Sequence, residues 1–211
     1  KPTLQEANHF KLEHIQDRQV WIGGSTHPGE EELILESHKQ VLKRYPESLL
    51  LLAPRKPERF KAVHKLIIDS GLTSSLWSEF ESLDPEISVL LIDTLGDLPF
   101  FYSAADMAFV GGSLFSVGGH NLLEPASLGK PVITGPILHN VEEISSQLMI
   151  NGGLAIINDS SELAETIITL FDDSSKIDTM VSGALEVMQD NKGAIENILQ
   201  LIKPLIKPLI K

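Results

Sequence analysis

The sequence predicts an α/β protein with a Rossmann-like, doubly wound parallel sheet. Two observations support this fold class. Short apolar runs alternate with amphipathic helical patterns from residue 20 onward, as repeated strand–helix units do. The runs at 48–53 and 87–92 are apolar at nearly every position, which is typical of strands buried on both faces of a parallel sheet. Right-handed crossovers would connect such strands.

The first strand–helix unit begins with an apolar run at 20–24 that ends in two glycines. The segment 25–32 then opens with Ser-Thr and closes with three glutamates, which is the pattern of a helix N-cap followed by an acidic first turn. Apolar residues at helical spacing continue until Pro46, because the residue before a proline disfavours the helical conformation.

The same strand–helix cycle repeats along the rest of the chain. Gly71 and Gly129 each follow a helical pattern and are typical of C-terminal helix caps. Further helices are expected toward the C-terminus. The predicted helices before them cover 57–70, 97–104, 121–128 and 141–150, and the predicted strands cover 48–53, 88–92, 107–110, 131–134 and 154–157.

The composition is that of an ordinary globular protein, with 42% apolar and 22% charged residues among 211. The net charge of −12 disfavours broad contact with polyanions, so no nucleic-acid partner is expected. The absence of cysteine excludes disulfides and cysteine–metal sites. No apolar run in the sequence has the length that a membrane-spanning helix needs.

The sequence at each end of the chain supports one prediction. The sequence opens Lys-Pro-Thr without an initiating methionine, so we expect a segment of a longer protein. Residues 201–211 repeat Leu-Ile-Lys-Pro and contain a proline at every fourth position. Because proline interrupts a continuous helix, we expect an irregular tail at 201–211.

Ligands of open parallel sheets bind beyond the carboxyl ends of the strands, so the loops at those ends carry the candidate site. In the first loop, Ser25 either caps the following helix or donates to a phosphate. After the second strand, two prolines stiffen a loop that presents Arg55, whose guanidinium suits a phosphate clamp. A salt bridge between Arg55 and Glu58 is the competing interpretation. Arg59 is expected on the helix surface.

Two further loops place glycine near the start of a helix. Backbone amides at 95–97 are suited to contact a base edge or a phosphate. In the fourth loop, two glycine pairs flank a polar turn at 111–120. Asn121 and Glu124 have the spacing of a capping box. Alternatively, the first-turn amides bind an anion and Glu124 accepts from ribose hydroxyls, and we favour this ligand-binding interpretation.

Several catalytic motifs are absent. The sequence contains no P-loop pattern and no Gly-x-Ser-x-Gly elbow, which disfavours a P-loop ATPase and an α/β-hydrolase. His120 and His139 lack the partners and spacing of a metal site, so no metal is expected.

Six sequence blocks occur in an order that resembles one enzyme family. They are Ser-Thr-His-Pro-Gly-Glu-Glu-Glu at 25–32, Pro-Arg-Lys-Pro-Glu-Arg-Phe at 54–60, Asp-Thr-Leu-Gly-Asp at 93–97, Phe-Val-Gly-Gly-Ser at 109–113, Gly-Gly-His-Asn-Leu-Leu-Glu-Pro-Ala at 118–126 and Leu-Gly-Lys-Pro-Val at 128–132. Together they resemble the C-terminal half of the 3-deoxy-D-manno-octulosonic acid (Kdo) transferases of Gram-negative bacteria. The Asn-x-x-Glu turn alone would indicate only the wider GT-B glycosyltransferase class.

This resemblance implies that residues 1–200 form the CMP-Kdo-binding C-terminal domain of a GT-B enzyme that transfers Kdo to a lipid A precursor. The acceptor-binding N-terminal domain would lie outside this chain. That domain would contribute the general base, the lipid A precursor site and the attachment to the cytoplasmic face of the inner membrane. No metal or other cofactor is implied. The chain alone would bind CMP but be inactive.

The same resemblance assigns the contacts to CMP. Carried over by motif, they are Pro54 and Arg55, then Leu95, Gly96 and Asp97, then Asn121, Leu122, Leu123 and Glu124, with Ser25 and His120 nearby. The family usually has His in place of Lys56 and Met-Gly-Glu at 95–97, so no side-chain role is assigned to Lys56 or Asp97. During attack by the acceptor hydroxyl on the anomeric carbon, Arg55 and the helix start at Asn121 would stabilise charge on the leaving phosphate.

Two other interpretations stay open. The first is a GT-B glycosyltransferase that uses a UDP-sugar, because the composition does not distinguish a cytosine site from a uracil site. The second is a non-catalytic α/β binding module, such as a flavodoxin-like regulatory domain. The number of strand units and the glycine-rich turn disfavour this module, and the segment 20–25 lacks the acidic cluster of a receiver-type domain.

Overall fold

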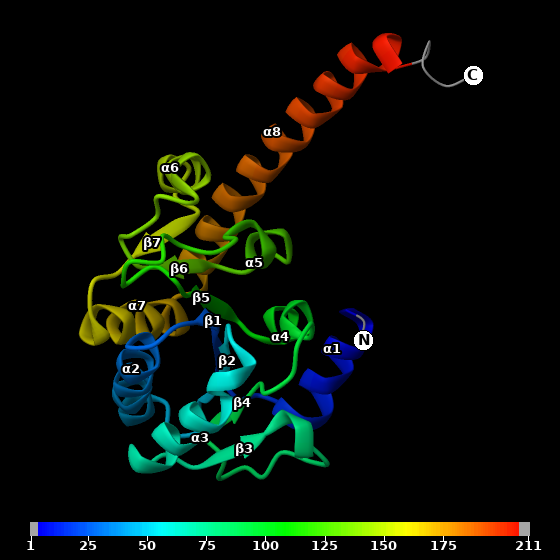
Figure 1. Cartoon of the computed structure of the whole chain (residues 1–211). Coiled ribbons are helices and arrows are strands. Elements are labelled where there is room, and N and C mark those ends of the chain that lie inside the picture. Colours follow the sequence, from blue (N-terminus) through cyan, green and yellow to red (C-terminus); the bar gives the residue numbers. More distant parts are fainter. Residues whose placement is uncertain (1–3, 207–211) are drawn as a thin grey trace.

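The computed structural model describes residues 4–206 and places seven parallel strands in one sheet (Figure 1). The strand order is β3-β4-β2-β1-β5-β6-β7, and every pairing is parallel. The predicted Rossmann-like, doubly wound fold is therefore confirmed. The strands are β1 Val20–Thr26, β2 Leu49–Pro54, β3 Ser74–Leu76, β4 Val89–Leu91, β5 Met107–Val110, β6 Val132–Thr134 and β7 Leu154–Ile156.

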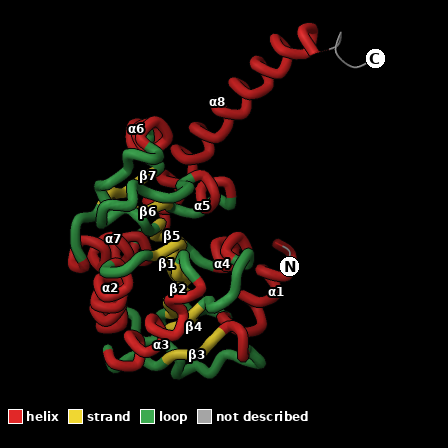
Figure 2. Tube along the Cα trace, viewed as in Figure 1, coloured by secondary structure: helices red, strands yellow, loops and turns green. Residues whose placement is uncertain are grey.

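Helices cover both faces of the sheet (Figure 2). Helices α2, α3 and α7 pack on one face, α1 and α4 pack on the other, and α5, α6 and α8 enclose the end formed by β6 and β7. Of the helices that the structure describes, none combines the length and apolar character needed to cross a membrane. The helices are α1 Leu4–Phe10, α2 Glu30–Arg44, α3 Phe60–Asp69, α4 Leu98–Ala104, α5 Leu123–Ser127, α6 Glu142–Ile150, α7 Ser160–Asp172 and α8 Ser174–Ile206.

The leucines of β2 show how the two halves of the core form. Leu50 and Leu52 belong to the apolar cluster beneath α2, α3 and α7, and Leu49 and Leu51 belong to the cluster beneath α1 and α4. Successive side chains of a strand point to opposite faces, so a run of apolar residues supplies both clusters. Each buried leucine stabilises the fold by about 1.5–3 kcal/mol relative to exposure.

The chain changes direction across the sheet between β1 and β5. The unit after β1 continues to β2 on one side, whereas the unit after β5 continues to β6 on the other, and β1 and β5 are neighbours. This is a topological switch point, at which the loops beyond two adjacent strands diverge and leave a crevice. The fold therefore brings together the loops after β1 and β5, which are far apart in the sequence.

The edge strand β3 and the helix α1 were not predicted. The edge strand β3 (Ser74–Leu76) has three residues, two of them serine, and all are half-buried, so no apolar run marks it. Helix α1 (Leu4–Phe10) packs against α4 through the buried Phe10. Its helical pattern is only seven residues long, which is too short for a clear periodicity in the sequence.

Helix α5 begins later than predicted. The sequence predicts a helix at 121–128 with Asn121 as its N-cap, but the helix covers Leu123–Ser127. The Oδ1 atom of Asn121 accepts from the backbone N–H of Leu123 at 3.1 Å. This two-residue spacing is that of an Asx turn, and Asn121 therefore precedes the helix instead of capping it.

The prediction of an irregular tail at 201–211 is wrong for residues 201–206. Helix α8 continues through Pro204 to Ile206. Proline has a φ angle compatible with a helix, so Pro204 costs backbone hydrogen bonding without preventing the helical path. The other tail residues, 207–211, lie outside the described part of the chain.

Candidate functional site

Two adjoining cavities lie at the carboxyl ends of the strands around the switch point, with volumes of about 260 Å³ and about 90 Å³. Ser25, Arg55 and Leu98 line both cavities, which therefore form one space that we call the switch-point cleft. The larger cavity is also lined by Tyr102, Val110, His120, Asn121 and Glu124, and the smaller by Ala53, Pro54, Ile92, Thr94, Leu95 and Gly96.

Most of the residues predicted to contact the nucleotide line this cleft. The lining includes Ser25, Pro54, Arg55, Leu95, Gly96, His120, Asn121 and Glu124. Three predicted residues do not line it. Leu122 is fully buried in the core beside α5, Leu123 begins α5, and Asp97 accepts a hydrogen bond from the Thr94 hydroxyl at 2.5 Å. The binding roles of all these residues stay predictions, but the fold places eight of them around one space.

Ser25 does not cap helix α2. It lies where the register between β1 and β2 shifts, and its φ angle is 55°. The helix begins five residues later, at Glu30. The bulge instead turns Ser25 into the switch-point cleft, as bulges at strand ends commonly do, and this leaves the phosphate-donor interpretation for Ser25.

Arg55 is exposed at the rim of the cleft. Its backbone N–H donates to the carbonyl of Thr26 at 3.0 Å, which ties the loop after β2 to the end of β1. Among the side chains that the structure describes, no carboxylate lies at salt-bridge distance from the Arg55 guanidinium. The competing salt bridge to Glu58 is therefore not formed, and the guanidinium is available to an anion.

Glu124 and Tyr102 line the larger cavity together with Arg55. Burial raises the pKa of the Glu124 carboxyl above its usual value, and its side chain forms no ion pair with any residue of the described chain. Burial also raises the pKa of Tyr102, so its hydroxyl stays protonated. Tyr102 was not predicted as a site residue, because an aromatic residue inside an apolar helix pattern is usually part of the core.

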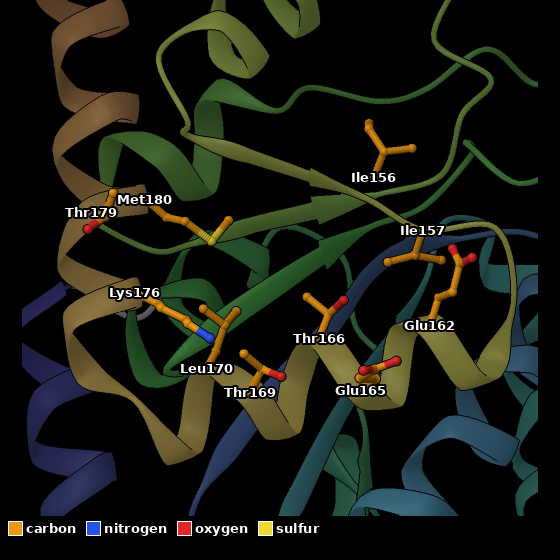
Figure 3. A pocket seen from close by; sticks show the side chains of 10 residues that line it. All are labelled: Ile156, Ile157, Glu162, Glu165, Thr166, Thr169, Leu170, Lys176, Thr179 and Met180. Carbon is orange, nitrogen blue, oxygen red and sulfur yellow. The ribbon is translucent and has the colours of Figure 1, made fainter.

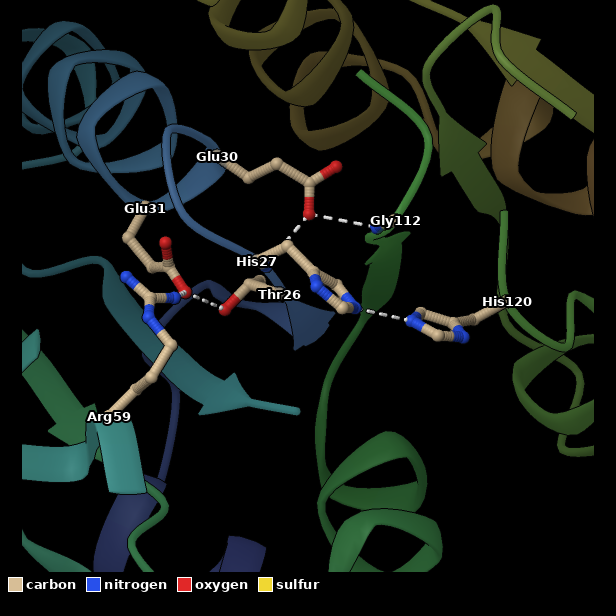
Figure 4. A network of polar contacts seen from close by, with 7 residues as sticks. All are labelled: Thr26, His27, Glu30, Glu31, Arg59, Gly112 and His120. Carbon is tan, nitrogen blue, oxygen red and sulfur yellow. Dashed lines mark hydrogen bonds and ion pairs between the residues drawn. The ribbon is translucent and has the colours of Figure 1, made fainter. Parts of the chain in front are cut away.

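His120 pairs with His27, a residue that the sequence analysis did not single out. Their Nε2 atoms are 2.8 Å apart and their rings are stacked (Figure 4). One nitrogen must donate and the other accept, so a single proton lies between the rings. Burial lowers the pKa of His27, and burial together with the neighbouring His27 lowers the pKa of His120. Both causes favour a neutral pair while the cleft holds no anion.

Arg59 is not on the helix surface, contrary to the prediction. Its Nη1 donates to Oε1 of Glu31 at 2.5 Å, and the Thr26 hydroxyl donates to the same oxygen at 2.9 Å (Figure 4). The Glu31 side chain is fully buried, and burial raises its pKa although both hydrogen bonds oppose this. The ion pair connects the loop that carries Arg55 with the first turn of α2.

The burial of Glu31 and of its neighbour Glu30 was missed, although the sequence contains a signal for it. Both glutamates have no exposed surface. They precede the buried Ile34 and Leu35 by four residues, and residues four apart lie on the same helix face. Extending the apolar periodicity backward would therefore have placed both carboxylates on the inward face of α2, where a carboxylate needs partners.

A larger cavity of about 550 Å³ lies between α7, α8 and the end of β7 (Figure 3). Threonine and aliphatic side chains dominate its wall, and Lys176 is its one cationic residue among those described. One of its carboxylates, Glu162, already accepts from the backbone N–H and the side-chain amide of Asn158. The cavity is outside the switch point, so the switch-point cleft is the better candidate for an anionic ligand.

Metal binding is a separate question. Among the residues whose side chains are described, no group of three or more His, Asp or Glu has an arrangement that could hold a metal ion. The expectation that neither a metal nor another cofactor is needed stays a prediction.

The chain is similar in sequence to a known protein family and to known enzymes. The family described as glycosyl transferases group 1 matches residues 17–187. A 3-deoxy-D-manno-octulosonic acid transferase of Haemophilus influenzae is 39% identical over 97% of this chain and 48% of its own length. A probable mitochondrial 3-deoxy-D-manno-octulosonic acid transferase of Arabidopsis thaliana is 32% identical over 95% of this chain and 46% of its own length. The chain thus spans about half the length of these curated relatives.

A solved structure of one part of such a protein matches nearly the whole chain. The C-terminal CMP-Kdo binding domain of WaaA from Acinetobacter baumannii superposes with a TM-score of 0.84 at 29% identity. The match covers 88% of this chain and 97% of that domain.

Fold and site together define a Rossmann-like α/β domain with a cleft at its switch point, the architecture of the C-terminal domain of GT-B glycosyltransferases. The chain belongs to the glycosyl transferases group 1 family. Within that family its homologues are Kdo transferases, and the resemblance predicted from the six sequence blocks is confirmed.

Proposed function

We propose that this chain is the donor-binding half of an enzyme that transfers Kdo from CMP-Kdo to a lipid A precursor. One observation carries the proposal. The chain matches the CMP-Kdo binding domain of WaaA over nearly all of that domain, and its switch-point cleft is lined by eight of the predicted contact residues. The acceptor site, the general base and the attachment to the cytoplasmic face of the inner membrane are assigned to a half outside this sequence.

The cleft suggests how the donor is held. Arg55, the unpaired cation at the rim, would bind the phosphate of CMP-Kdo. Glu124 would accept from the ribose hydroxyls, as acidic residues do in other dinucleotide-binding folds. The backbone at 95–97, which lines the smaller cavity with Leu95 and Gly96, would contact the cytosine edge.

Arg55 would also act in the transfer step. The acceptor hydroxyl attacks the anomeric carbon, the bond from that carbon to the phosphate oxygen breaks, and CMP leaves with the bonding electrons. The negative charge that grows on the phosphate would be stabilised by the guanidinium of Arg55. Helix α5 would stabilise this charge less than the sequence predicts, because the helix has only five residues and begins after Asn121.

Calorimetric titration of the chain with CMP, UMP and inorganic phosphate tests the proposal. We expect CMP to bind in preference to UMP and phosphate, and Arg55→Ala to weaken CMP binding by about tenfold or more, since a hydrogen bond to a charged group contributes about 1.5–3 kcal/mol. Lys61→Ala removes an exposed cation from α3 and should leave the affinity unchanged.

Two outcomes of this titration contradict the proposal. Preference for UMP would indicate a glycosyltransferase that uses a UDP-sugar. Lack of CMP binding by the wild-type chain would contradict its assignment as a donor-binding half that functions as a separate unit.

A further inference from the structure

The carboxylate of Glu30 is the most completely coordinated acid of the described chain. Its Oε2 accepts from the backbone N–H of His27 at 2.9 Å and of Gly112 at 2.8 Å. Its Oε1 accepts from the backbone N–H of Ser113 at 2.9 Å and of Leu114 at 3.1 Å. The side chain has no exposed surface, so backbone N–H groups replace the water that a buried carboxylate loses.

Three of these four donors come from the turn that follows β5. Successive backbone N–H groups that point to one centre form an anion-binding nest, and the loops at a switch point are where open α/β sheets bind ligands. In this protein the nest at 112–114 is filled by a carboxylate of the chain itself. Figure 4 shows its contact with Gly112.

The first glycine pair of the turn is explained by this internal anion. A Cβ atom on Gly111 would lie 2.7 Å from Oε2 of Glu30, and a Cβ atom on Gly112 would lie 2.8 Å from Cδ2 of His120. Gly112 also has a φ angle of +74°, which side chains disfavour. The glycines that the sequence analysis attributed to an external ligand therefore make room for Glu30 and for the His120 ring.

Two hydrogen-bonded routes connect Glu30 with His120. Along the first, Gly112 donates to Glu30, and the carbonyl of Gly112 accepts from the N–H of Gly119, the residue before His120, at 2.6 Å. Along the second, Glu30 holds the backbone of His27, and the His27 ring pairs with the His120 ring at 2.8 Å. Both routes end at a side chain that lines the switch-point cleft.

We propose that Glu30 is a positioning residue of the donor site: it occupies the nest at 112–114 as an internal anion and thereby holds His120 in the switch-point cleft. This inference rests on the proposed function of that cleft. It also implies that the donor phosphate binds at Arg55, because the nest beyond β5 is already neutralised by Glu30.

Glu30→Gln, with Glu32→Gln as the matched control, tests the proposal. Glutamine keeps the shape of the side chain, but its NH₂ group faces N–H donors that need an acceptor. Glu32 lies on the same turn of α2 and is exposed, so its variant changes the net charge equally. We expect Glu30→Gln to weaken CMP binding in calorimetry by about tenfold or more, and Glu32→Gln to leave the affinity unchanged.

Nuclear magnetic resonance supplies readouts that need no nucleotide. In Glu30→Gln the amide signals of Gly112, Ser113 and Leu114 should shift markedly. The charge of Glu30 raises the pKa values of His27 and His120 against their burial and the nearby Arg55. Lys56 and Arg59 also lower the pKa of His27, so a histidine titration should show both pKa values falling further in the variant. Glu32 is not among the groups that shift the pKa of either histidine, so Glu32→Gln should leave both pKa values unchanged.

The outcomes separate this inference from the proposed function. CMP affinity equal to wild type in Glu30→Gln would overturn the positioning role. If the wild-type chain binds no CMP, the proposed function fails, and the amide and histidine signals still decide whether Glu30 is the internal anion that orients His120. If Glu30→Gln does not fold, amide hydrogen exchange in the wild type decides. Slow exchange at 112–114 supports the nest, and exchange as fast as in an open loop contradicts it.

Discussion

At the scale of single residues, His38 illustrates a titratable group that the fold keeps neutral. The indole N–H of Trp21 donates to its Nδ1 at 3.1 Å, and its Nε2 donates to the carbonyl of Ser88 at 2.9 Å. Burial lowers the pKa of His38 from 6.5 to about 4. Both ring nitrogens are used by the neutral form, and a second ring proton would face the Trp21 donor.

His38 should make stability depend on pH in a definite direction. Its pKa is lower in the folded state, so the unfolded chain binds more protons between pH 6.5 and pH 4 and the free energy of unfolding falls as the pH falls. The loss over that range is roughly 3 kcal/mol at about 1.4 kcal/mol per pH unit. Urea denaturation at several pH values measures it.

The contribution of His38 to the pH dependence of stability is measured by comparing wild type with a variant. His38→Gln should be less stable than wild type at pH 7 and should show a shallower decline of the unfolding free energy toward pH 4. Parallel slopes for wild type and His38→Gln would contradict the assignment.

The residue scale also separates what could be predicted in the candidate site from what could not. Arg55 was predicted because two prolines stiffen the loop that presents it directly after a buried strand, and Glu124 because it follows a polar turn flanked by two glycine pairs. Tyr102 and His27 were missed because the position of Tyr102 in the cleft and the pairing of His27 with His120 depend on contacts between segments that are distant in the sequence. Leu122 was predicted as a contact but is buried, since a motif does not state which way each of its side chains points.

At the scale of elements, α8 packs against the rest of the domain through a glycine. A Cβ atom on Gly183 would lie 1.9 Å from the carbonyl oxygen of Asn151, in the turn between α6 and β7. Close approach of two backbones thus explains a glycine in the interior of a long helix. The intrinsic helix propensity of this residue is about 1 kcal/mol less favourable than that of alanine.

Gly183→Ala should therefore destabilise the protein, by about 1–3 kcal/mol as expected for overpacking, although alanine is the better helix former. Thermal unfolding followed by circular dichroism measures the effect. Ser182 is exposed on the same helix, and Ser182→Ala should be neutral or slightly stabilising. An increase of the melting temperature in Gly183→Ala would show that α8 does not approach Asn151 this closely.

At the scale of the whole molecule, we proposed that this chain binds the donor and that the other half supplies the general base, which leads to a prediction about activity. The chain spans about half the length of its curated relatives, and the general base is assigned to the other half. We expect the chain alone to bind CMP but to transfer no Kdo from CMP-Kdo to a lipid A precursor, because a positioned base activates the acceptor hydroxyl. Detection of product by mass spectrometry with this chain alone would contradict the prediction.

The amino-acid sequence by itself determined the fold class and the loops of the candidate site. Strand-length apolar runs, helical periodicity and glycine at turns are local patterns, and the physical preferences behind them act within a few residues. They therefore predicted six of the seven strands, β3 excepted, and the loops that carry Arg55, Gly96 and Glu124.

Only the tertiary structure decided how these loops meet. Residues 27 and 120 pair, and residue 30 contacts 112–114, because β1 and β5 are neighbours in the sheet. Such contacts join segments more than eighty residues apart, and no local pattern specifies them. The burial of Glu30 followed from the same neighbourhood, since a carboxylate is stable inside a protein only where the fold brings enough donors to it.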